Sequence, residues 1–276
     1  MSNKYFGHEN KLGDKNTLGD FNELGNKNKF GNENTFGHEN TFGNENKLGD
    51  FNVFGNGNTF GDANELGDKN TLGDENTFGD FNTLGNRNKL CDFNSLGYKN
   101  KLGNKNTFGD GNELGDENEL DSENTFGHEN TFGNGNKFGD GNELGDENTL
   151  GDENTFGDFN TLGDYTKLGD NCTLGESNKL GNGLKFGKKL TIEGVKCRDL
   201  MTMGNVDGLG GQGQVVIIVH TEGIKIRAGC FSGSLDEFCA NAESENKITY
   251  SKVVRAAAEA FEQCVNEKGM TGGWDD

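Results

Sequence analysis

The chain contains no proline, and only 30% of its 276 residues are hydrophobic. It has no apolar run of the roughly 18 residues that a transmembrane helix needs, which excludes such a helix. Residues 1–7 lack the apolar stretch of a signal peptide, so we expect a cytoplasmic location, in the host cell if the gene belongs to a phage. The six cysteines show no framework spacing, which favours reduced thiols and agrees with that location.

Acidic residues outnumber basic ones, and the formal net charge is -20 at pH 7. Together with the low hydrophobicity, this composition taken alone would favour disorder. The charge also argues against direct binding to nucleic acid or to an anionic membrane, and it favours basic partners.

A strict six-residue repeat nevertheless occupies most of the chain. Every sixth residue from Phe6 to Phe186 is Leu or Phe, which makes 31 consecutive positions without insertion or deletion. The next residue is Gly except at Cys91 and Asp121, and Asn stands two residues before the Leu or Phe in 26 consecutive hexads. Disordered sequences do not keep phase over so many units, so the repeat indicates a folded structure.

Within one hexad, the Asn-Thr-Leu segment predicts a strand of three residues, and Gly-Asp-x predicts a turn. Because strand side chains alternate, Asn and the Leu or Phe point to one side and the middle residue to the other. Gly is expected in the turn either because a side chain would clash or because φ is unusual. One hexad cannot enclose a core, but three consecutive hexads can close a triangular coil around stacked Leu, Phe and Asn side chains. About ten coils at ~4.8 Å predict a rod of roughly 50 Å.

This hexad resembles the hexapeptide repeat of left-handed parallel β-helix proteins, over about residues 6–187. The resemblance implies a mainly β, three-sided, left-handed parallel β-helix, and the handedness rests on the resemblance alone. The chain departs from the family pattern by placing Asn at the small inward position, where stacked amides can bond along the axis. Enzymes of this fold usually carry their chemistry in insertions. This repeat has none, so we expect no catalytic residues, cofactor or metal.

Charge is unevenly distributed over the three sides of such a prism. On the third side, the first eight hexads begin at residues 19, 37, 55, 73, 91, 109, 127 and 145 and contain no Lys or Arg. Their 11 acidic residues are Asp20, Glu23, Glu39, Asp74, Glu75, Asp92, Asp110, Glu113, Glu129, Asp146 and Glu147. Eight coils span roughly 38 Å, which gives about one negative charge per 3.5 Å, close to the value of about 3.4 Å for one strand of B-DNA.

This acidic stripe has two interpretations. It can serve solubility and prevent solenoids from stacking end to end. Alternatively, the rod mimics DNA and fills the nucleic-acid groove of a host protein such as a nuclease, a restriction or CRISPR complex, or a topoisomerase, with carboxylates in place of phosphates. Phe21, Phe93 and Tyr165 lie on the same side, each four coils from the next, and are candidate anchors for that partner.

The working hypothesis is therefore a non-enzymatic, phage-type DNA mimic whose partner is a basic nucleic-acid-binding host protein. One alternative is a structural or display rod in which the C-terminal region engages the partner. A second alternative is a hexapeptide acyltransferase, because enzymes of that fold use a histidine base. His8, His38 and His128, however, only replace Asp or Asn in an unchanged turn.

Other chemistries find little support in the sequence. There is no Cys-x-x-Cys pair, which speaks against a zinc site. The hexads lack the nonapeptide pattern with paired Gly of calcium-binding β-rolls. Outward Thr residues on the third side resemble the Thr ladders of ice-binding solenoids, but this side is acidic and Glu113 interrupts the Thr row.

Residues 188–276 differ in composition, and we predict a small α+β domain after a boundary at 187/188. Residues 189–197 predict a strand leaving the solenoid, residues 208–213 a flexible link, and residues 214–220 and 223–228 a hairpin. Ser232 or Ser234 is expected to cap a helix that ends near residue 246, and a second helix is expected from about residue 251 to residue 267. The apolar face of that second helix would comprise Val253, Val254, Ala257, Ala258, Phe261 and Val265.

The run from Ile226 to Phe238 resembles a small domain that follows hexapeptide repeats in uncharacterised phage and prophage proteins. The resemblance implies a genomic context and no particular chemistry. Such a domain can cap the C-terminal end of the solenoid, whose edge strands would otherwise be open. No equivalent sequence precedes the first hexad, so we expect that end to pair with a second copy in a homodimer.

Overall fold

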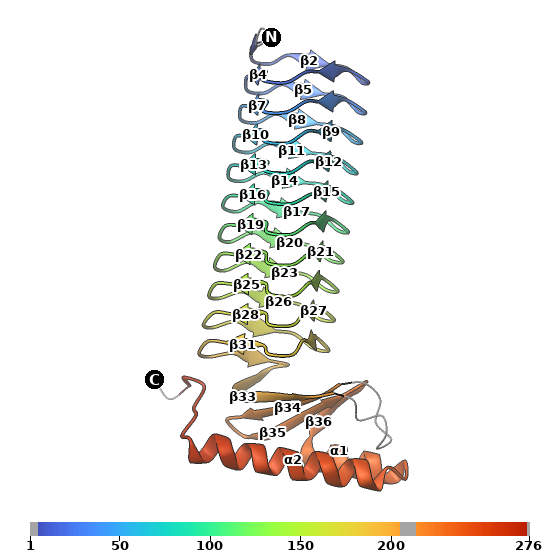
Figure 1. Cartoon of the computed structure of the whole chain (residues 1–276), viewed down its shortest axis with the longest axis vertical. Coiled ribbons are helices and arrows are strands. Elements are labelled where there is room, and N and C mark those ends of the chain that lie inside the picture. Colours follow the sequence, from blue (N-terminus) through green and yellow to red (C-terminus); the bar gives the residue numbers. More distant parts are fainter. Residues whose placement is uncertain (1–4, 205–213, 275–276) are drawn as a thin grey trace.

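The computed structural model describes residues 5–204 and 214–274 (Figure 1). It shows an elongated rod of stacked coils, with antiparallel strands and two helices at the C-terminal end. Each hexad contributes one short strand, which pairs in parallel with the strand three hexads further along the chain, as Tyr5 pairs with Glu23. The predicted coil of three hexads is therefore confirmed, and each coil supplies one strand to each of three sheets, here called A, B and C. The left-handed winding that the resemblance implies stays a prediction.

Every strand of the rod is two residues long, one shorter than predicted, because the inward Asn lies just before it. Sheet A contains β1 (Tyr5–Phe6), β4 (Glu23–Leu24), β7 (Thr41–Phe42), β10 (Thr59–Phe60), β13 (Thr77–Phe78), β16 (Ser95–Leu96), β19 (Glu113–Leu114), β22 (Thr131–Phe132), β25 (Thr149–Leu150), β28 (Lys167–Leu168) and β31 (Lys185–Phe186). Sheet B begins with β2 (Lys11–Leu12), β5 (Lys29–Phe30), β8 (Lys47–Leu48), β11 (Glu65–Leu66), β14 (Thr83–Leu84), β17 (Lys101–Leu102), β20 (Glu119–Leu120), β23 (Lys137–Phe138), β26 (Thr155–Phe156), β29 (Thr173–Leu174) and β32 (Thr191–Ile192). Sheet C contains β3 (Thr17–Leu18), β6 (Thr35–Phe36), β9 (Val53–Phe54), β12 (Thr71–Leu72), β15 (Lys89–Leu90), β18 (Thr107–Phe108), β21 (Thr125–Phe126), β24 (Glu143–Leu144), β27 (Thr161–Leu162) and β30 (Lys179–Leu180).

The interior of the rod holds the Leu and Phe side chains in columns. All the repeat's Leu and Phe residues from residue 18 to residue 180 are buried. Rings one coil apart stack on each other, with centroid distances of 4.6 Å between Phe42 and Phe60 and 4.5 Å between Phe60 and Phe78. Burial stabilises the fold by about 1.5–3 kcal/mol for each such side chain, so these columns are the main source of stability.

The inward Asn residues form further buried columns that hold the coils together. Oδ1 of Asn58 accepts the backbone N–H of Asn40 at 2.9 Å, and Nδ2 of Asn58 donates to the carbonyl oxygen of Gly55 at 2.8 Å. Nδ2 of Asn40 also donates to Oδ1 of Asn58 at 3.1 Å. The expected bonding of amides along the axis is thus confirmed, although backbone groups are their more frequent partners. Thr166, which replaces Asn, keeps the bond to its own hexad by donating from Oγ1 to Gly163 at 3.0 Å.

The corners of the prism depart from the expectation in one respect. Positive φ falls on the third residue of the corner, not on the Gly that opens it; φ is 55° at Glu39 and 57° at Phe93. The opening Gly is required by close packing, since a Cβ at Gly127 would lie 2.8 Å from the carbonyl oxygen of Gly109. The predicted clash is therefore confirmed, and the predicted unusual φ at this Gly is wrong.

The C-terminal module continues sheet B beyond the rod. β33 (Val195–Met203), β34 (Val215–His220), β35 (Gly223–Ala228) and β36 (Phe231–Ser234) follow β32 in antiparallel order. The helices α1 (Leu235–Ser244) and α2 (Ile248–Glu267) follow. One face of this sheet, with Val216 and Ile218, joins the hydrophobic core of the rod, and the other, with Val215 and Ile217, packs against the helices. The sheet thus covers the last coil (Figure 1).

Several predictions for this module are confirmed and others are wrong. The hairpin has the predicted bounds except that β34 begins one residue later, at Val215, and Ser234 caps α1 as expected. β36 and most of β33 were not predicted, and α2 begins earlier than predicted, at Ile248. Val253 was expected on the apolar face of α2 but is exposed, because the buried positions of this helix follow Val254 and Ala258. The predicted link at 208–213 lies outside the described residues.

Candidate partner-binding surface

Most of the predicted acidic residues lie at the corner where the chain passes from sheet C to sheet A. This acidic corner consists of the four-residue segments that precede the strands of sheet A, one in each coil, from residues 19–22 to residues 181–184. It holds Asp20, Glu39, Asp74, Glu75, Asp92, Asp110, Glu129, Asp146 and Glu147. The other two predicted residues, Glu23 and Glu113, stand beside it on the outward face of sheet A.

The second residue of each corner segment bonds one coil to the next. Oδ1 of Asp20 accepts the backbone N–H of His38 at 2.8 Å, and Oδ1 of Asp92 accepts that of Asp110 at 2.9 Å. The same bond recurs at every step up to Asn182. The acidic corner is therefore one continuous column, in which successive coils follow at about 4.8 Å.

The third residue of each corner segment bonds to the next coil only through its backbone N–H, so its side chain has no such role. Glu75, Glu129 and Glu147 have φ of 60°, 57° and 61°, and their side chains are exposed. Backbone geometry turns these residues outward at each coil, while the Asp residues each commit one oxygen to the column. The Glu carboxylates are therefore the groups most available to a partner.

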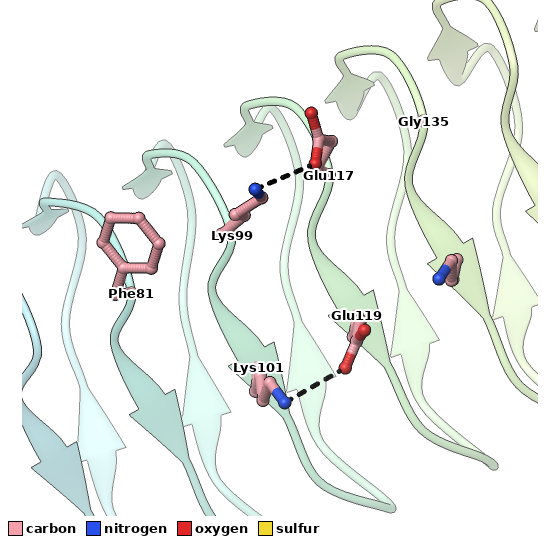
Figure 2. A pocket seen from close by; sticks show the side chains of 7 residues that line it. Phe81, Lys99, Lys101, Glu117, Glu119 and Gly135 are labelled. Atoms are coloured by element: carbon pink, nitrogen blue, oxygen red, sulfur yellow. Dashed lines mark ion pairs between the residues drawn. The ribbon is translucent and has the colours of Figure 1, made fainter.

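The Lys–Glu ion pairs of the rod lie on the other two corners and on sheet B, and none of those in the described residues lies at the acidic corner. Figure 2 shows Lys99 paired with Glu117 at 3.3 Å and Lys101 with Glu119 at 3.4 Å, each pair joining neighbouring coils. The remaining pairs of this kind are Lys15–Glu33, Lys27–Glu45, Lys47–Glu65 and Lys105–Glu123. Within the described part of the chain, no Lys or Arg forms an ion pair with a carboxylate of the acidic corner; the nearest case is His128 with Asp146 at 3.8 Å.

The surfaces beside the acidic corner are also poor in positive charge. Over the first eight coils, the outward strand residues of sheets A and C are mainly Thr, and Lys89 is their only cation. Short hydroxyl side chains on both sides leave the acidic column as the most strongly charged feature of this surface. Its field therefore adds up along the rod and is not cancelled locally.

The three candidate aromatic anchors all occupy the third corner position. Phe21, Phe93 and Tyr165 expose 44%, 64% and 61% of their surface, so the structure leaves them accessible, as the anchor hypothesis requires. The ring of Phe93 covers Gly111, whose hypothetical Cβ would lie 2.7 Å from Cε1 of Phe93, and Tyr165 covers Gly183 in the same way. One face of each of these two rings is thus occupied by the next coil.

The three histidines of the repeat have a structural partner. Nδ1 of His38 accepts the backbone N–H of Asn56 at 2.8 Å, and Nδ1 of His128 accepts that of Asp146 at 2.8 Å. His8 does the same on another corner. The ring nitrogen takes the place of the Asp or Asn oxygen, which explains why His is accepted at this position; the bond requires the proton to sit on Nε2.

The cysteines form no disulfide, and two of the buried ones are unreactive. All six cysteines are free. Burial raises the pKa of the Cys172 thiol to about 11 and also raises that of Cys197, which keeps both in the unreactive thiol form at neutral pH. In the described residues, no group of three or more His, Cys, Asp or Glu is placed to hold a metal ion.

A groove of about 880 Å³ lies between the last coils and the C-terminal sheet. Phe159, Leu162 and Leu180 line one side, and Gln214 and Arg227 line the other. Nε2 of Gln214 donates to the carbonyl oxygen of Leu180 at 2.6 Å. This hydrogen bond connects the two sides of the groove.

Comparison with known proteins found no matching protein family, no similar curated protein and no similar solved structure. The resemblance of the run 226–238 to phage proteins therefore has no support from a family match. The assignment as a parallel β-solenoid rests on the structure itself. None of the described helices has the length and apolar character to cross a membrane.

Proposed function

We propose that the protein is a non-enzymatic, phage-type DNA mimic that binds a basic, nucleic-acid-binding host protein through the acidic corner. The observation that carries the proposal is the absence of ion pairs with Lys or Arg at this corner among the described residues, while six lysines elsewhere on the rod each pair with a glutamate one coil later. A protein that needed negative charge only for solubility would gain nothing from sorting its lysines in this way.

The geometry of the acidic corner suits a groove that binds a phosphate backbone. Continuous hydrogen bonds between coils keep the column rigid, so its carboxylates are preorganised. The nine carboxylates of the corner give about one charge per 4 Å over roughly 38 Å, and Glu23 and Glu113 beside it bring the spacing to about 3.5 Å. One strand of B-DNA carries one charge per about 3.4 Å. Arg and Lys of the partner would pair with the exposed Glu carboxylates and release ions as they do on DNA, so binding should fall steeply with salt.

The structure identifies suitable residues for a test. Replacing the Asp residues by Lys would break the hydrogen bonds between coils. The third corner position tolerates lysine, as Lys15, Lys27 and Lys69 show on the other corners. We therefore choose a triple variant with Glu75→Lys, Glu129→Lys and Glu147→Lys. The matched control, Glu33→Lys, Glu123→Lys and Glu153→Lys, changes the net charge equally at the same backbone position on the other two corners. It also breaks the exposed pairs Lys15–Glu33 and Lys105–Glu123, which contribute little to stability.

The three proteins are immobilised and exposed to lysate of a bacterial host at low salt, followed by a salt gradient. The proposal predicts that wild type and control retain the same basic protein up to the same salt concentration. The corner variant should release it at a much lower salt concentration or fail to capture it. Equal loss from both variants would contradict the proposal, because net charge alone would then explain binding. Equal retention by both would favour a display rod whose C-terminal module holds the partner.

A further inference from the structure

The outward face of sheet A carries mostly short side chains. Thr41, Thr59, Thr77 and Ser95 follow one another in register on consecutive coils, and Thr131 and Thr149 continue the row beyond Glu113. Such side chains let a second surface approach closely along the whole rod. The eleven strands of this sheet span about 48 Å at ~4.8 Å per coil.

Two residues of opposite charge stand symmetrically about the centre of this face, whereas Glu113 lies opposite Thr77. Ser95 belongs to the middle strand, Glu23 lies four strands before it, and Lys167 lies four strands after it. Tyr5 and Lys185 occupy the first and last strands. Neither Glu23 nor Lys167 forms an ion pair within the described chain. A half-turn that exchanges the two ends of the rod therefore places Glu23 against Lys167, and Tyr5 against Lys185.

The adjoining acidic corner has the same centre of symmetry. Phe93 belongs to the hexad of Ser95, and Phe21 and Tyr165 lie four coils before and after it. The same half-turn thus places Phe93 on its own copy and Phe21 on Tyr165. All three rings are exposed. These rings lie at the corner, whereas Glu23 and Lys167 lie on the strands of sheet A. Both sets of residues are symmetric about the hexad of Ser95.

Side-chain size at the corner agrees with this centre as well. The half-turn places Glu129 opposite Gly57 and Glu75 opposite Gly111, so a long side chain meets a glycine in both cases. A shift by one coil would lose this match and would separate the aromatic residues. The half-turn also opposes carboxylates at this exposed edge, where salt screens the repulsion. They are Glu39 with Glu147, Asp20 with Asp164, Asp74 with Asp110, and Asp92 with its own copy.

We infer that two copies of the chain pack sheet A against sheet A, antiparallel, with a two-fold axis at the hexad of residues 91–96. With a face about 12 Å wide and 48 Å long, the pair buries roughly 1,200 Å², at the lower end of stable interfaces. The interface is isologous: Thr41 meets Thr149, Thr59 meets Thr131, and each Glu23–Lys167 contact occurs twice. This surface is distinct from the N-terminal end, where the sequence led us to expect pairing.

The other arrangements are less favourable. Parallel rods would set Glu23 on Glu23 and Lys167 on Lys167. The corresponding antiparallel overlay of sheet C would place Glu143 against Val53, which offers the carboxylate no hydrogen bond, whereas Glu113 on sheet A would meet the hydroxyl of Thr77. Sheet B carries lysine or glutamate on most of its outward positions, including the consecutive Lys11, Lys29 and Lys47.

The antiparallel dimer has a consequence that rests on the proposed function. Because strand direction is kept by this half-turn, the two acidic corners lie along the same edge and run in opposite directions. Facing sheets are about 10 Å apart, so the edge would carry two antiparallel rows of negative charge at a separation between the two groove widths of DNA, about 6 and 12 Å. The dimer itself requires no target protein and is tested without one.

A cross-linking experiment locates the interface. The background carries Cys91→Gly, Cys230→Ser and Cys264→Ser, which removes the accessible thiols. In it, Ser95→Cys should be joined to its own copy by a short bismaleimide cross-linker, because sheets about 10 Å apart are too distant for a direct disulfide. Thr59→Cys alone should not, whereas Thr59→Cys together with Thr131→Cys should. Cross-linking through Asn10→Cys in the first coil, with none through Ser95→Cys, would overturn the inference in favour of end-to-end pairing.

Charge reversal tests the same interface in solution by sedimentation equilibrium. We expect a dimer for the wild type, a dissociation constant raised at least tenfold by Glu23→Lys or by Lys167→Glu, and recovery in the protein that carries both changes. Recovery of the dimer in the double variant would show that the single variants lost the Glu23–Lys167 contact and did not misfold. A wild type that stays monomeric at ~100 μM, or a dimer that neither reversal weakens, would overturn the inference. Either result would leave the capture experiment on the acidic corner interpretable, since that assay does not depend on dimerisation.

Discussion

At the scale of single residues, two side chains in each hexad carry hydrogen bonds between coils. The inward Asn accepts the backbone N–H of the Asn one coil earlier, and the second corner residue accepts the backbone N–H of its counterpart one coil later. Backbone groups that a short strand leaves unpaired are thereby satisfied. This double set of acceptors explains why the repeat keeps Asn inside and restricts the second corner position almost entirely to Asp, Asn and His.

Replacing one inward Asn should lower the free energy of unfolding by more than the loss of a small side chain would. Asn58→Ala would leave the N–H of Asn40 and the carbonyl oxygen of Gly55 without their side-chain partner in the interior. We expect a loss of about 2–4 kcal/mol in the free energy of unfolding. Asn58→Thr should lose about half of that, since Thr166 shows that a hydroxyl keeps the bond to its own hexad. Urea unfolding followed by circular dichroism measures both, and equal losses in the two variants would argue against this role.

The corner histidines give a second prediction. His38→Asn should keep the stability of the wild type, because Oδ1 of Asn occupies the same acceptor position at other corners, as Asn26 does for Asn44. His38→Ala should cost about 1 kcal/mol, since the N–H of Asn56 loses its acceptor. Thermal unfolding of the two variants distinguishes this structural role from a chemical one: an equally large loss with Asn would mean that the imidazole ring itself matters.

The sequence predicted which residues point inward but not how the corners are built. The alternation within Asn-Thr-Leu follows from strand geometry alone. The positive φ at Glu39, Phe93 and their equivalents could not be foreseen, because non-glycine residues seldom adopt it. It arises from stacking: the N–H of Glu39 reaches the carbonyl oxygen of Asn56 in the next coil at 3.0 Å. Local preference is overruled by contacts between neighbouring coils, whose strands lie three hexads apart along the chain.

Relief of this backbone strain should be measurable. Ala63 has φ of 55° and an exposed side chain, so Ala63→Gly removes a left-handed residue without removing a buried contact. We expect a gain of up to about 1 kcal/mol in the free energy of unfolding, less than the full cost of the conformation because Gly also adds freedom to the unfolded chain. Urea titration measures the change, and a loss of stability would contradict the strain argument.

At the scale of elements, a buried ion network fixes the C-terminal sheet to the end of the rod. Glu193, in the turn between β32 and β33, is buried and lies 3.3 Å from both Lys225 and Arg227. Ser232 donates to the same carboxylate at 2.7 Å. Burial alone would raise the pKa of Glu193, but the hydrogen bond from Ser232 and the two cations outweigh it and hold the pKa below its ordinary value.

The lowered pKa of Glu193 predicts how pH affects the junction. Its carboxylate stabilises the fold fully above the ordinary Glu pKa of about 4.3, and this contribution is lost as pH falls through the lower pKa of the folded state. At pH 7, Glu193→Gln should cost about 3 kcal/mol because Arg227 stays buried without a counter-charge. Near pH 2–3 the variant and the wild type should become similar.

The single tryptophan supplies the readout for that experiment. Trp274 donates from Nε1 to the carbonyl oxygen of Cys197 at 2.9 Å, close to the junction. Its fluorescence in guanidinium titrations at neutral and acid pH reports unfolding there. A difference between variant and wild type that persists undiminished at pH 2–3 would show that the carboxylate charge is not what stabilises this junction.

Elements of the C-terminal module were predictable where the sequence carries a local signal. Ser234 and Glu237 form a capping box, and α1 was placed correctly. α2 begins at Ile248 after Lys247, which makes no side-chain cap, so nothing marked its start. β36 was missed because Phe231-Ser232-Gly233-Ser234 lacks the β-branched residues typical of strands, and it is held in place by pairing with β35.

At the scale of the whole molecule, the repeat predicted both the rod and the distribution of its charge. Once each coil holds three hexads, the place of every carboxylate follows from its number, and the structure confirms this coil length. The pairing of lysines with glutamates on the other surfaces could not be predicted, because it depends on the reach of side chains between coils. That pairing is what separates the acidic corner from the rest of an acidic molecule.

The most direct test of DNA mimicry is competition between the protein and duplex DNA for the captured host partner. The purified partner is held on the immobilised rod and challenged with a duplex of about 15 base pairs, a length comparable to the rod, over a range of salt concentrations. The account predicts complete displacement by DNA and an affinity for the rod that falls steeply and linearly with salt on logarithmic axes. A ternary complex of rod, partner and DNA, or an affinity indifferent to salt, would contradict it.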